Sequence, residues 1–97
     1  MDADLMFLGI LSRGGKLRIG PDCLHAKKGA LLLLASDCSN NTKKQFLSFA
    51  YSHNIEVKEI HTKSELGECL GYQELSGILI GDIRAAKAYL AKLPSPK

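Results

Sequence analysis

Cationic side chains gather in one stretch of this 97-residue chain. Residues 13–28 hold five basic residues and a single acid, Asp22, although the net charge of the whole chain is only +3. Within this stretch, Gly20-Pro21-Asp22 is a helix-start signal, because proline fixes φ in the first turn and an acid suits the helix dipole. Cations beside free N–H groups at a helix start bind phosphate well. The stretch therefore predicts a polyanion site, with a solvated helix face as the alternative.

Asp22 adds a group that phosphate binding does not require. A carboxylate within a basic rim accepts hydrogen bonds from the amino groups of guanine or cytosine, so it suggests contact with base edges. Stacking side chains are scarce, since the chain has three tyrosines, no tryptophan and three phenylalanines that fit a core. Scarce stacking disfavours single-strand binding. We therefore expect structured RNA, read by its shape and a few base edges, and no DNA.

Asp37 and Asp82 are the candidates for catalysis. Each follows a predicted buried strand, so the two would lie side by side if those strands were neighbours, and they could hold Mg²⁺ or share a proton. An acid directly after a strand is also a common turn or cap residue, and this interpretation is favoured. The scattered His25, His53 and His61 fit surface or helix-end positions. The sequence predicts a protein that is not an enzyme.

The three cysteines, Cys23, Cys38 and Cys69, include no Cys-x-x-Cys pair. An odd number without that spacing argues against a disulfide framework and a structural zinc site, so we expect reduced thiols. Cys23 and His25 could supply two metal ligands, but a third and fourth are not evident nearby. We expect no metal and no other cofactor.

One apolar run organises the rest of the chain. Residues 30–35 are unbroken in their apolar character, which is typical of a strand covered by helices on both faces. Loops at the carboxyl ends of such strands usually bind the ligand, so residues 36–41 are candidate contacts. The alternation of polar and apolar residues over 55–60 indicates an edge strand.

Helices and strands alternate along the sequence. We predict helices over residues 3–12, 20–28, 40–54, 62–70 and 83–93, and strands over 16–19, 30–35, 55–60 and 77–80. This order predicts an α/β protein, a three-layer α/β/α sandwich with a central mixed sheet of about four strands. Residues 1–93 form a single predicted domain, and 94–97 read as a flexible tail.

Two observations concern the setting of the protein. No stretch approaches the ~18 consecutive apolar residues of a membrane span, and acids occupy positions near the first methionine where a secretory signal needs bases. We expect a cytoplasmic protein with no membrane partner that is monomeric when free.

Three segments carry a family resemblance. They are residues 8–16, the buried strand with its following loop over 31–44, and residues 62–71, in which Ser-Glu-Leu-Gly over 64–67 is the most specific part. In this order they resemble the ribosomal protein L7Ae/L30e superfamily, and the small bacterial YlxQ-like members are the nearest match. The resemblance implies a non-catalytic α/β/α sandwich that binds kink-turn RNA, a sharply bent helix-bulge-helix with tandem sheared G·A pairs.

The resemblance also implies where RNA would bind, ribosomal RNA being one candidate. The family's contact surface is the start of the second helix, the loop after the next strand and the loop before the last strand. On this chain these places are Gly20, Asp22, Cys23 and Ala26, then Ser36 and Asp37, then Leu75 and Ser76. The other expected RNA contacts are Lys16, which matches the lysine before the motif, and Lys27. The expected phosphate contacts are Arg13, Arg18, Lys28 and Lys44.

The second-helix motif departs from the family pattern of a glycine, an Asn-Glu pair and a lysine one turn further. Here those positions hold Gly20, Asp22, Cys23 and Ala26. A thiol does not accept from guanine as a carboxylate does, and a good polar base contact is worth about 1–3 kcal/mol. The alternative function is therefore a protein-interaction module on the same fold that has lost its RNA specificity.

Overall fold

The computed structural model describes residues 3–93, and the predicted tail over 94–97 lies outside this range. Helices and strands alternate as the sequence predicts. Along the chain they are α1 (Ala3–Arg13), β1 (Leu17–Ile19), the 3-10 helix η1 (Gly20–His25), β2 (Leu31–Leu34), α2 (Asn40–Ser52), β3 (Glu56–Glu59), α3 (Lys63–Leu70), β4 (Gly77–Ile80) and α4 (Ile83–Ala91).

The strands form one mixed sheet in the order β1-β4-β2-β3. β2 and β3 are parallel, whereas β4 runs antiparallel to both of its neighbours. The carboxyl ends of β1, β2 and β3 therefore lie at the same end of the sheet as the amino end of β4. β3 is an edge strand, as the alternating pattern of residues 55–60 predicts.

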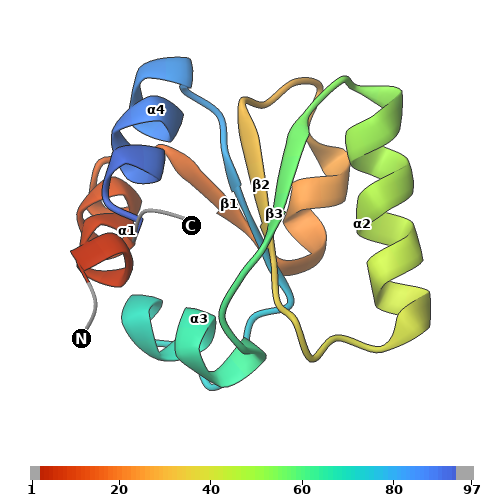
Figure 1. Cartoon of the computed structure of the whole chain (residues 1–97), viewed down its shortest axis with the longest axis horizontal. Helices are drawn as coiled ribbons and strands as arrows, with labels where there is room; N and C mark the ends of the chain where they lie inside the picture. The colour runs from red at the N-terminus through yellow and green to blue at the C-terminus, as the bar shows by residue number, and fades with distance from the viewer. Residues whose placement is uncertain (1–2, 94–97) are drawn as a thin grey trace.

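Helices cover both faces of the sheet, so the predicted three-layer α/β/α sandwich is confirmed. α1, α3 and α4 lie on one face, and η1 and α2 lie on the other (Figure 1). The four leucines of β2 are buried between these layers, as the unbroken apolar run requires. Leu8, Leu66 and Tyr89 fill one side of the core, and Cys23, Phe46 and Phe49 fill the other.

Side-chain caps fix where three helices begin. The Ser39 hydroxyl accepts from the Thr42 N–H at 3.2 Å in α2, and the Asp82 carboxylate accepts from the Arg84 N–H at 3.1 Å in α4. Thr62 and Glu65 form the predicted capping box of α3. Ser39 and Thr62 lie in the connections that follow β2 and β3, whereas Asp82 follows β4 at the other end of the sheet.

The predicted helix over residues 20–28 is wrong in type and length. The structure has a 3-10 helix of 6 residues, after which Ala26 is extended with ψ of 147°. Gly20 makes the turn out of β1 with φ of +57°, a conformation that favours glycine. A 3-10 helix of about two turns has only a weak dipole, because few peptide groups align. The helix dipole therefore does not contribute to the predicted phosphate site, and the cations remain.

The hypothesis of a magnesium site between Asp37 and Asp82 is also wrong. The strands that precede them, β2 and β4, are neighbours, but they are antiparallel, with Leu31 opposite Ile80 and Leu34 opposite Gly77. Asp37 and Asp82 consequently lie at opposite ends of the sheet. Each does act as a cap, since Asp37 accepts from the Lys63 N–H and Asp82 from the Arg84 N–H. The turn-and-cap interpretation is therefore confirmed for both.

Candidate nucleic-acid interface

Three segments that are distant in sequence meet where β2 ends and β4 begins. The Ala35 N–H and the Cys38 thiol both donate to the Ser76 carbonyl, at 2.9 and 3.4 Å. The Cys23 thiol lies 3.3 Å from the Arg18 carbonyl and 3.7 Å from the Gly77 carbonyl, which ties η1 to the same place. We name this region the motif end, and its candidate contacts are Gly20, Asp22, Ser36, Asp37 and Ser76. The three segments that the family resemblance marks are thus brought together.

The polar side chains of the motif end take part in internal hydrogen bonds. The Ser36 hydroxyl donates to the His61 carbonyl at 2.9 Å, and the Ser36 N–H donates to the same oxygen at 2.8 Å. An Asp37 carboxylate oxygen accepts from the Lys63 N–H at 2.8 Å. Asp37 and Ser36 therefore hold the loop after β2 against the start of α3 before any ligand arrives.

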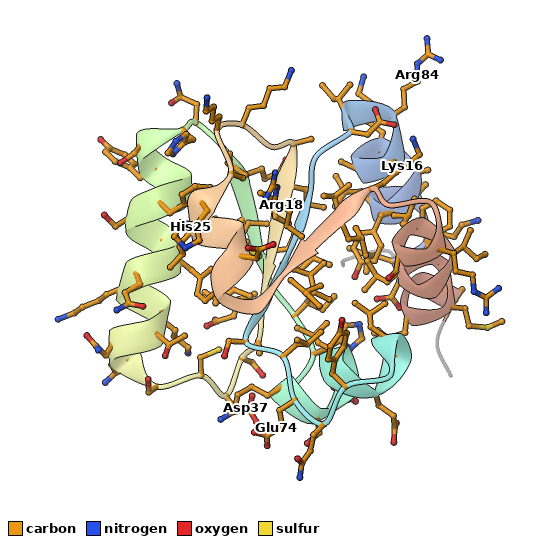
Figure 2. The ribbon with its side chains drawn as sticks, turned by 180° about the vertical axis from the view of Figure 1, so that it is seen from behind. Lys16, Arg18, His25, Asp37, Glu74 and Arg84 are labelled. Carbon is orange, nitrogen blue, oxygen red and sulfur yellow. The ribbon has the colours of Figure 1, made fainter. Side chains whose placement is uncertain are left out.

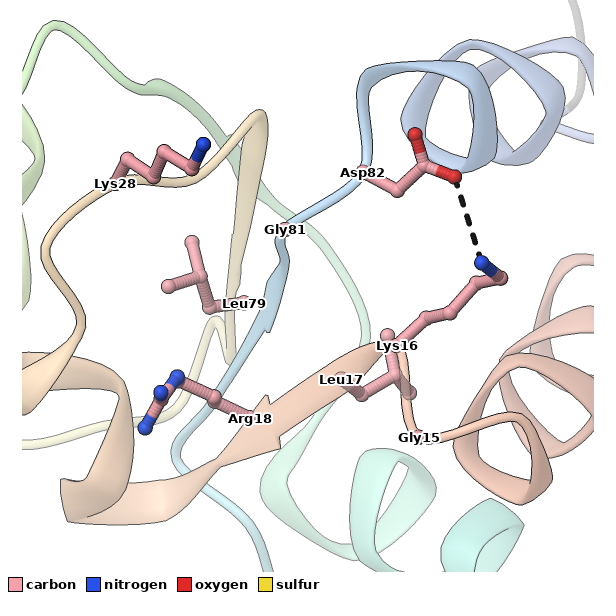
Figure 3. A pocket seen from close by; sticks show the side chains of 8 residues that line it. All are labelled: Gly15, Lys16, Leu17, Arg18, Lys28, Leu79, Gly81 and Asp82. Carbon is pink, nitrogen blue, oxygen red and sulfur yellow. Dashed lines mark ion pairs between the residues drawn. The ribbon is translucent and has the colours of Figure 1, made fainter.

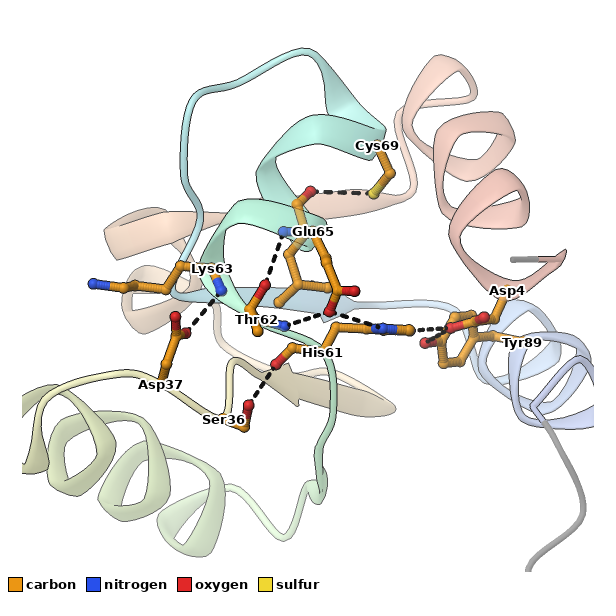
Figure 4. A network of polar contacts seen from close by, with 10 residues as sticks. Asp4, Ser36, Asp37, His61, Thr62, Lys63, Glu65, Cys69 and Tyr89 are labelled. Carbon is orange, nitrogen blue, oxygen red and sulfur yellow. Dashed lines mark hydrogen bonds and ion pairs between the residues drawn. The ribbon is translucent and has the colours of Figure 1, made fainter. Parts of the chain in front are cut away.

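A buried polar network stands behind this loop (Figure 4). Asp4 is 2% exposed, and its carboxylate accepts from the Tyr89 hydroxyl at 2.8 Å and lies 2.6 Å from His61 Nε2. The other ring nitrogen of His61 lies 3.5 Å from Glu65. Burial and the neighbouring Asp4 carboxylate raise the pKa of Tyr89. His61 directly precedes the α3 cap Thr62, as the predicted helix-end position requires. Its side chain is only 11% exposed, because its ring lies between Asp4 of α1 and Glu65 of α3.

Three of the predicted RNA contacts are buried. Cys23 is 0% exposed, and Ala26 and Leu75 belong to the core. Burial raises the pKa of the Cys23 thiol to about 12, so this group is an uncharged core thiol. In this conformation the side chains of Cys23, Ala26 and Leu75 lie in the core and are not exposed to a ligand. Cys23 and Ala26 are buried where the short η1 packs directly on β1 and β4. Leu75 lies in the loop before β4, where its N–H donates to the Lys63 carbonyl at the start of α3.

The cations gather elsewhere, in what we name the basic groove. It is a pocket of about 280 Å³ beside β1, and Lys16, Arg18 and Lys28 line it around the side chain of Leu79 (Figure 3). Its one acidic lining residue, Asp82, lies 3.7 Å from the Lys16 ammonium, and both side chains are well exposed. An exposed pair of this kind contributes little, so phosphate can compete for Lys16.

A second pocket, of about 370 Å³, continues the basic groove. Lys27 and His25 line it, and it shares Arg18, Lys28 and Gly81 with the first pocket. Sequence reasoning missed His25, Leu79 and Gly81 as groove residues, although His25 falls inside the basic stretch. Figure 2 shows that Lys16 lies away from the end of the molecule where Asp37 and Glu74 are found, with Arg18 between. The basic groove and the motif end are therefore separate regions that meet near β1.

Two predicted phosphate contacts lie outside the basic groove. Arg13 ends α1, which covers the opposite face of the sheet from η1. Lys44 lines a different pocket between η1 and α2, together with Leu24 and Phe49. The structure thus brings Lys16, Arg18, Lys27 and Lys28 together and leaves Arg13 and Lys44 apart from them.

A family model matches residues 22–89, which is more than half of the chain. This chain belongs to the ribosomal protein L7Ae/L30e/S12e/Gadd45 family. Membership in this family, whose members are generally non-catalytic RNA-binding proteins, indicates RNA binding for the chain. The superfamily resemblance found in the sequence is thereby confirmed.

A solved structure supports the fold of this L7Ae-family chain. It is that of a protein with unknown function from Bacillus halodurans, with 26% sequence identity and a TM-score of 0.82, and the match covers 94% of this chain and 96% of that chain. No curated protein matches the chain significantly.

Two further findings concern the residues that the structure describes. No helix within residues 3–93 combines the length and the apolar character needed to cross a membrane. Within the same residues, no three His, Cys, Asp or Glu side chains lie close enough together to hold a metal ion. For the Cys23 and His25 pair, the Cys23 thiol is buried and His25 is exposed.

Proposed function

We propose that this protein binds structured RNA without catalysing a reaction, holding the phosphate backbone in the basic groove and a kink-turn-like bend at the motif end. The observation that carries the proposal is the basic groove, in which Lys16, Arg18, Lys27 and Lys28 line two joined pockets on one face of an L7Ae-family fold. Phosphate contacts supply most of the affinity of such proteins for nucleic acids and position the protein on its target.

The two regions are close enough for one RNA to contact both. The Arg18 guanidinium lies 3.9 Å from the Asp22 carboxylate, so the basic groove adjoins the exposed side of η1. β4 connects the regions with four residues, a span of about 13 Å at the usual rise of a strand. In this proposal Asp22, Ser36 and Ser76 supply the polar contacts to the bend, and the cations hold the phosphates that flank it.

Finer assignments belong to the same proposal. We place the protein with the small bacterial YlxQ-like members of the family and propose ribosomal RNA in the cytoplasm as the first RNA to test. The motivation is the resemblance of residues 64–67 and of the loop after β2 to that group.

The test is a titration of a fluorescently labelled kink-turn RNA. The matched control is the same RNA with its G·A pairs replaced by Watson–Crick pairs. We expect tighter binding of the kink-turn, and a slope of log K against log salt of about −3 to −4, because four cations release four counterions. Equal affinity for the two RNAs would remove the kink-turn claim, and absence of binding would overturn the proposal.

A specific observation favours the alternative, a protein-interaction module. Cys23 and Ala26 occupy positions at which the family resemblance expects base-contacting polar side chains, and both are buried here. An interaction module would bind neither RNA in the titration. Binding that weakens steeply with salt would exclude it.

A further inference from the structure

The outer edge of β3 is open. β3 pairs only with β2, and within residues 3–93 no other strand or helix covers its second edge, which faces the viewer in Figure 1. The Ile60 N–H donates to the Leu34 carbonyl at 3.0 Å, so Ile60 directs its backbone groups toward β2. Because backbone direction alternates along a strand, Lys58 and Glu56 also face β2, whereas Val57 and Glu59 direct their N–H and C=O groups outward.

In place of the monomer expected from the sequence, we propose that two copies of this chain form a dimer by pairing β3 with β3 in antiparallel orientation, about a two-fold axis that passes beside Val57. The two Val57 residues would exchange both of their backbone hydrogen bonds across the axis. Ile55 of each copy would stand opposite Glu59 of the other, where only the Ile55 carbonyl can pair, because the Ile55 N–H donates to the Ala50 carbonyl at 2.9 Å. The result is one continuous sheet of eight strands, which leaves the basic groove, beside β1, at the far edge of each copy.

The charges of β3 select this register. In an antiparallel pair, residues whose backbone groups face outward must stand opposite each other. The register of one β3 relative to the other can therefore change only in steps of two residues. With Val57 opposite Val57, Glu56 of each copy stands opposite Lys58 of the other, which gives two opposite-charge pairs in the dimer. A shift in one direction would place Glu56 opposite Glu56, and a shift in the other would place Lys58 opposite Lys58. Glu56 and Lys58 would form non-hydrogen-bonded pairs across the dimer, and side chains in such pairs lie closer together than in hydrogen-bonded pairs. Opposite charges at these positions therefore stabilise the dimer.

An apolar patch lies beside the same edge. Tyr51 is 89% exposed and Leu47 is 46% exposed, and both come from α2, which packs on β2 and β3. Together with Ile55 and Val57 they line a groove of about 460 Å³. In a two-fold dimer the patches of both copies lie on the same face beside the axis, so each covers the other. A patch of this kind on an edge strand is a usual site of association.

Dimerisation is tested by sedimentation of the purified full-length chain without RNA, over a range of concentrations. We expect a monomer–dimer equilibrium that shifts to dimer as the concentration rises. Glu56→Lys alone places lysine opposite lysine, and Lys58→Glu alone places glutamate opposite glutamate. Each single variant should raise the dimer Kd at least about tenfold, since two cross-strand pairs change from attraction to repulsion.

The chain supplies its own matched controls. The double variant Glu56→Lys/Lys58→Glu restores both opposite-charge pairs and should dimerise as the natural chain does. Mixing the two single variants should give a heterodimer in which every facing pair has opposite charge. Glu56 and Lys58 are exposed, so circular dichroism should show all variants folded.

The proposal would be overturned by a monomer at every soluble concentration, which would mean that the charges only protect the edge. A dimer that is indifferent to the single charge reversals would overturn it equally, because another surface would then hold the two copies together. A monomer that still binds RNA would leave the proposed RNA function intact, so the two proposals fail separately.

Discussion

The motif end and the basic groove use their polar groups in opposite ways. At the motif end, Ser36 and Asp37 bond to the backbone of the segment that leads into α3, and Cys23 is sealed under η1. In the basic groove, Lys28 and Arg18 extend into an open pocket. Ser36, Asp37 and Cys23 thus build the architecture. The cations of the basic groove have only exposed, weak ion-pair partners, as Arg18 has in Asp22. Similarity to the family sequence pattern identifies the residues of the motif end. The gathering of exposed cations in a concave surface identifies the residues of the basic groove.

The largest effect is expected from the network behind the motif end. Asp4→Ala removes the carboxylate that accepts from the Tyr89 hydroxyl and pairs with the His61 ring. Both of these largely buried polar groups then lose their hydrogen-bond partner. We expect the free energy of unfolding to fall by about 3 kcal/mol. Urea unfolding followed by circular dichroism measures it. Asp4→Asn keeps an oxygen acceptor for Tyr89 and should lose distinctly less. Equal stability of Asp4→Ala and the natural chain would show that the motif end does not depend on this network.

The second prediction concerns the basic groove. Arg18→Ala/Lys28→Ala should weaken RNA binding by roughly 10- to 100-fold near physiological salt and make the salt slope shallower by about two. The control is Lys87→Ala/Lys92→Ala, which removes the same charge at exposed sites that line neither pocket and lie outside the β3 edge. Anisotropy titrations at several salt concentrations measure both quantities. If the control weakened binding as much, net charge alone would explain the affinity and the groove would have no special role.

The sequence specified the order of elements and the sandwich well. The apolar run before Ser36 and the capping box at Thr62 are local signals, and local physics decides them. It predicted the segment after Gly20 less well, because the choice between a short 3-10 turn and a longer helix depends on how Cys23 packs against β4, a contact across 54 residues. The pairing of β2 with β4 in antiparallel orientation, which separates Asp37 from Asp82, is equally non-local.

The candidate site shows the same division. The charge count over residues 13–28 located the basic groove in outline, and four of its cations were expected contacts. The sequence could not separate Arg13 from this group, because only the three-dimensional fold places the end of α1 on the other face of the sheet. The burial of Asp4 could have been predicted. Leu5, Leu8 and Leu11 mark the buried face of α1, and Asp4 directly precedes the first of these leucines.

The third prediction compares the two regions through one residue. Asp37→Ala removes the acceptor for the first N–H of α3, so we expect a loss of about 1 kcal/mol in the free energy of unfolding. RNA affinity, measured at a temperature where the variant is folded, should change little. Asp37→Asn keeps an acceptor and is the matched control. A large loss of RNA affinity with unchanged stability would instead make Asp37 a direct contact, and the motif end would then be the main recognition surface.

The smallest expected effect is on the pH dependence of the free energy of unfolding, and it tests whether Cys23 at the motif end is buried in solution. We expect no effect of the Cys23 thiol below pH 9. An unfolded thiol ionises near pH 9.0, whereas burial raises the pKa of Cys23 to about 12 and that of Cys69 to about 11. Above pH 9 the unfolded chain therefore binds fewer protons than the folded chain, and the free energy of unfolding falls as the pH rises. The lysines also titrate in this range but are common to the natural chain and Cys23→Ala, so the difference in their free energies of unfolding reports on the Cys23 thiol alone. This difference should shift against the natural chain between about pH 9 and pH 12.

Alkylation gives the complementary measurement for this thiol. At neutral pH, iodoacetamide should modify Cys23 far more slowly in the folded chain than in urea, because the thiol is sealed beneath η1 and stays protonated. The partly exposed Cys69 serves as the internal comparison within the same sample. Rapid modification of Cys23 alone would mean that η1 opens in solution. The second-helix positions would then become accessible to RNA, and the contrast between a closed motif end and an open basic groove would disappear.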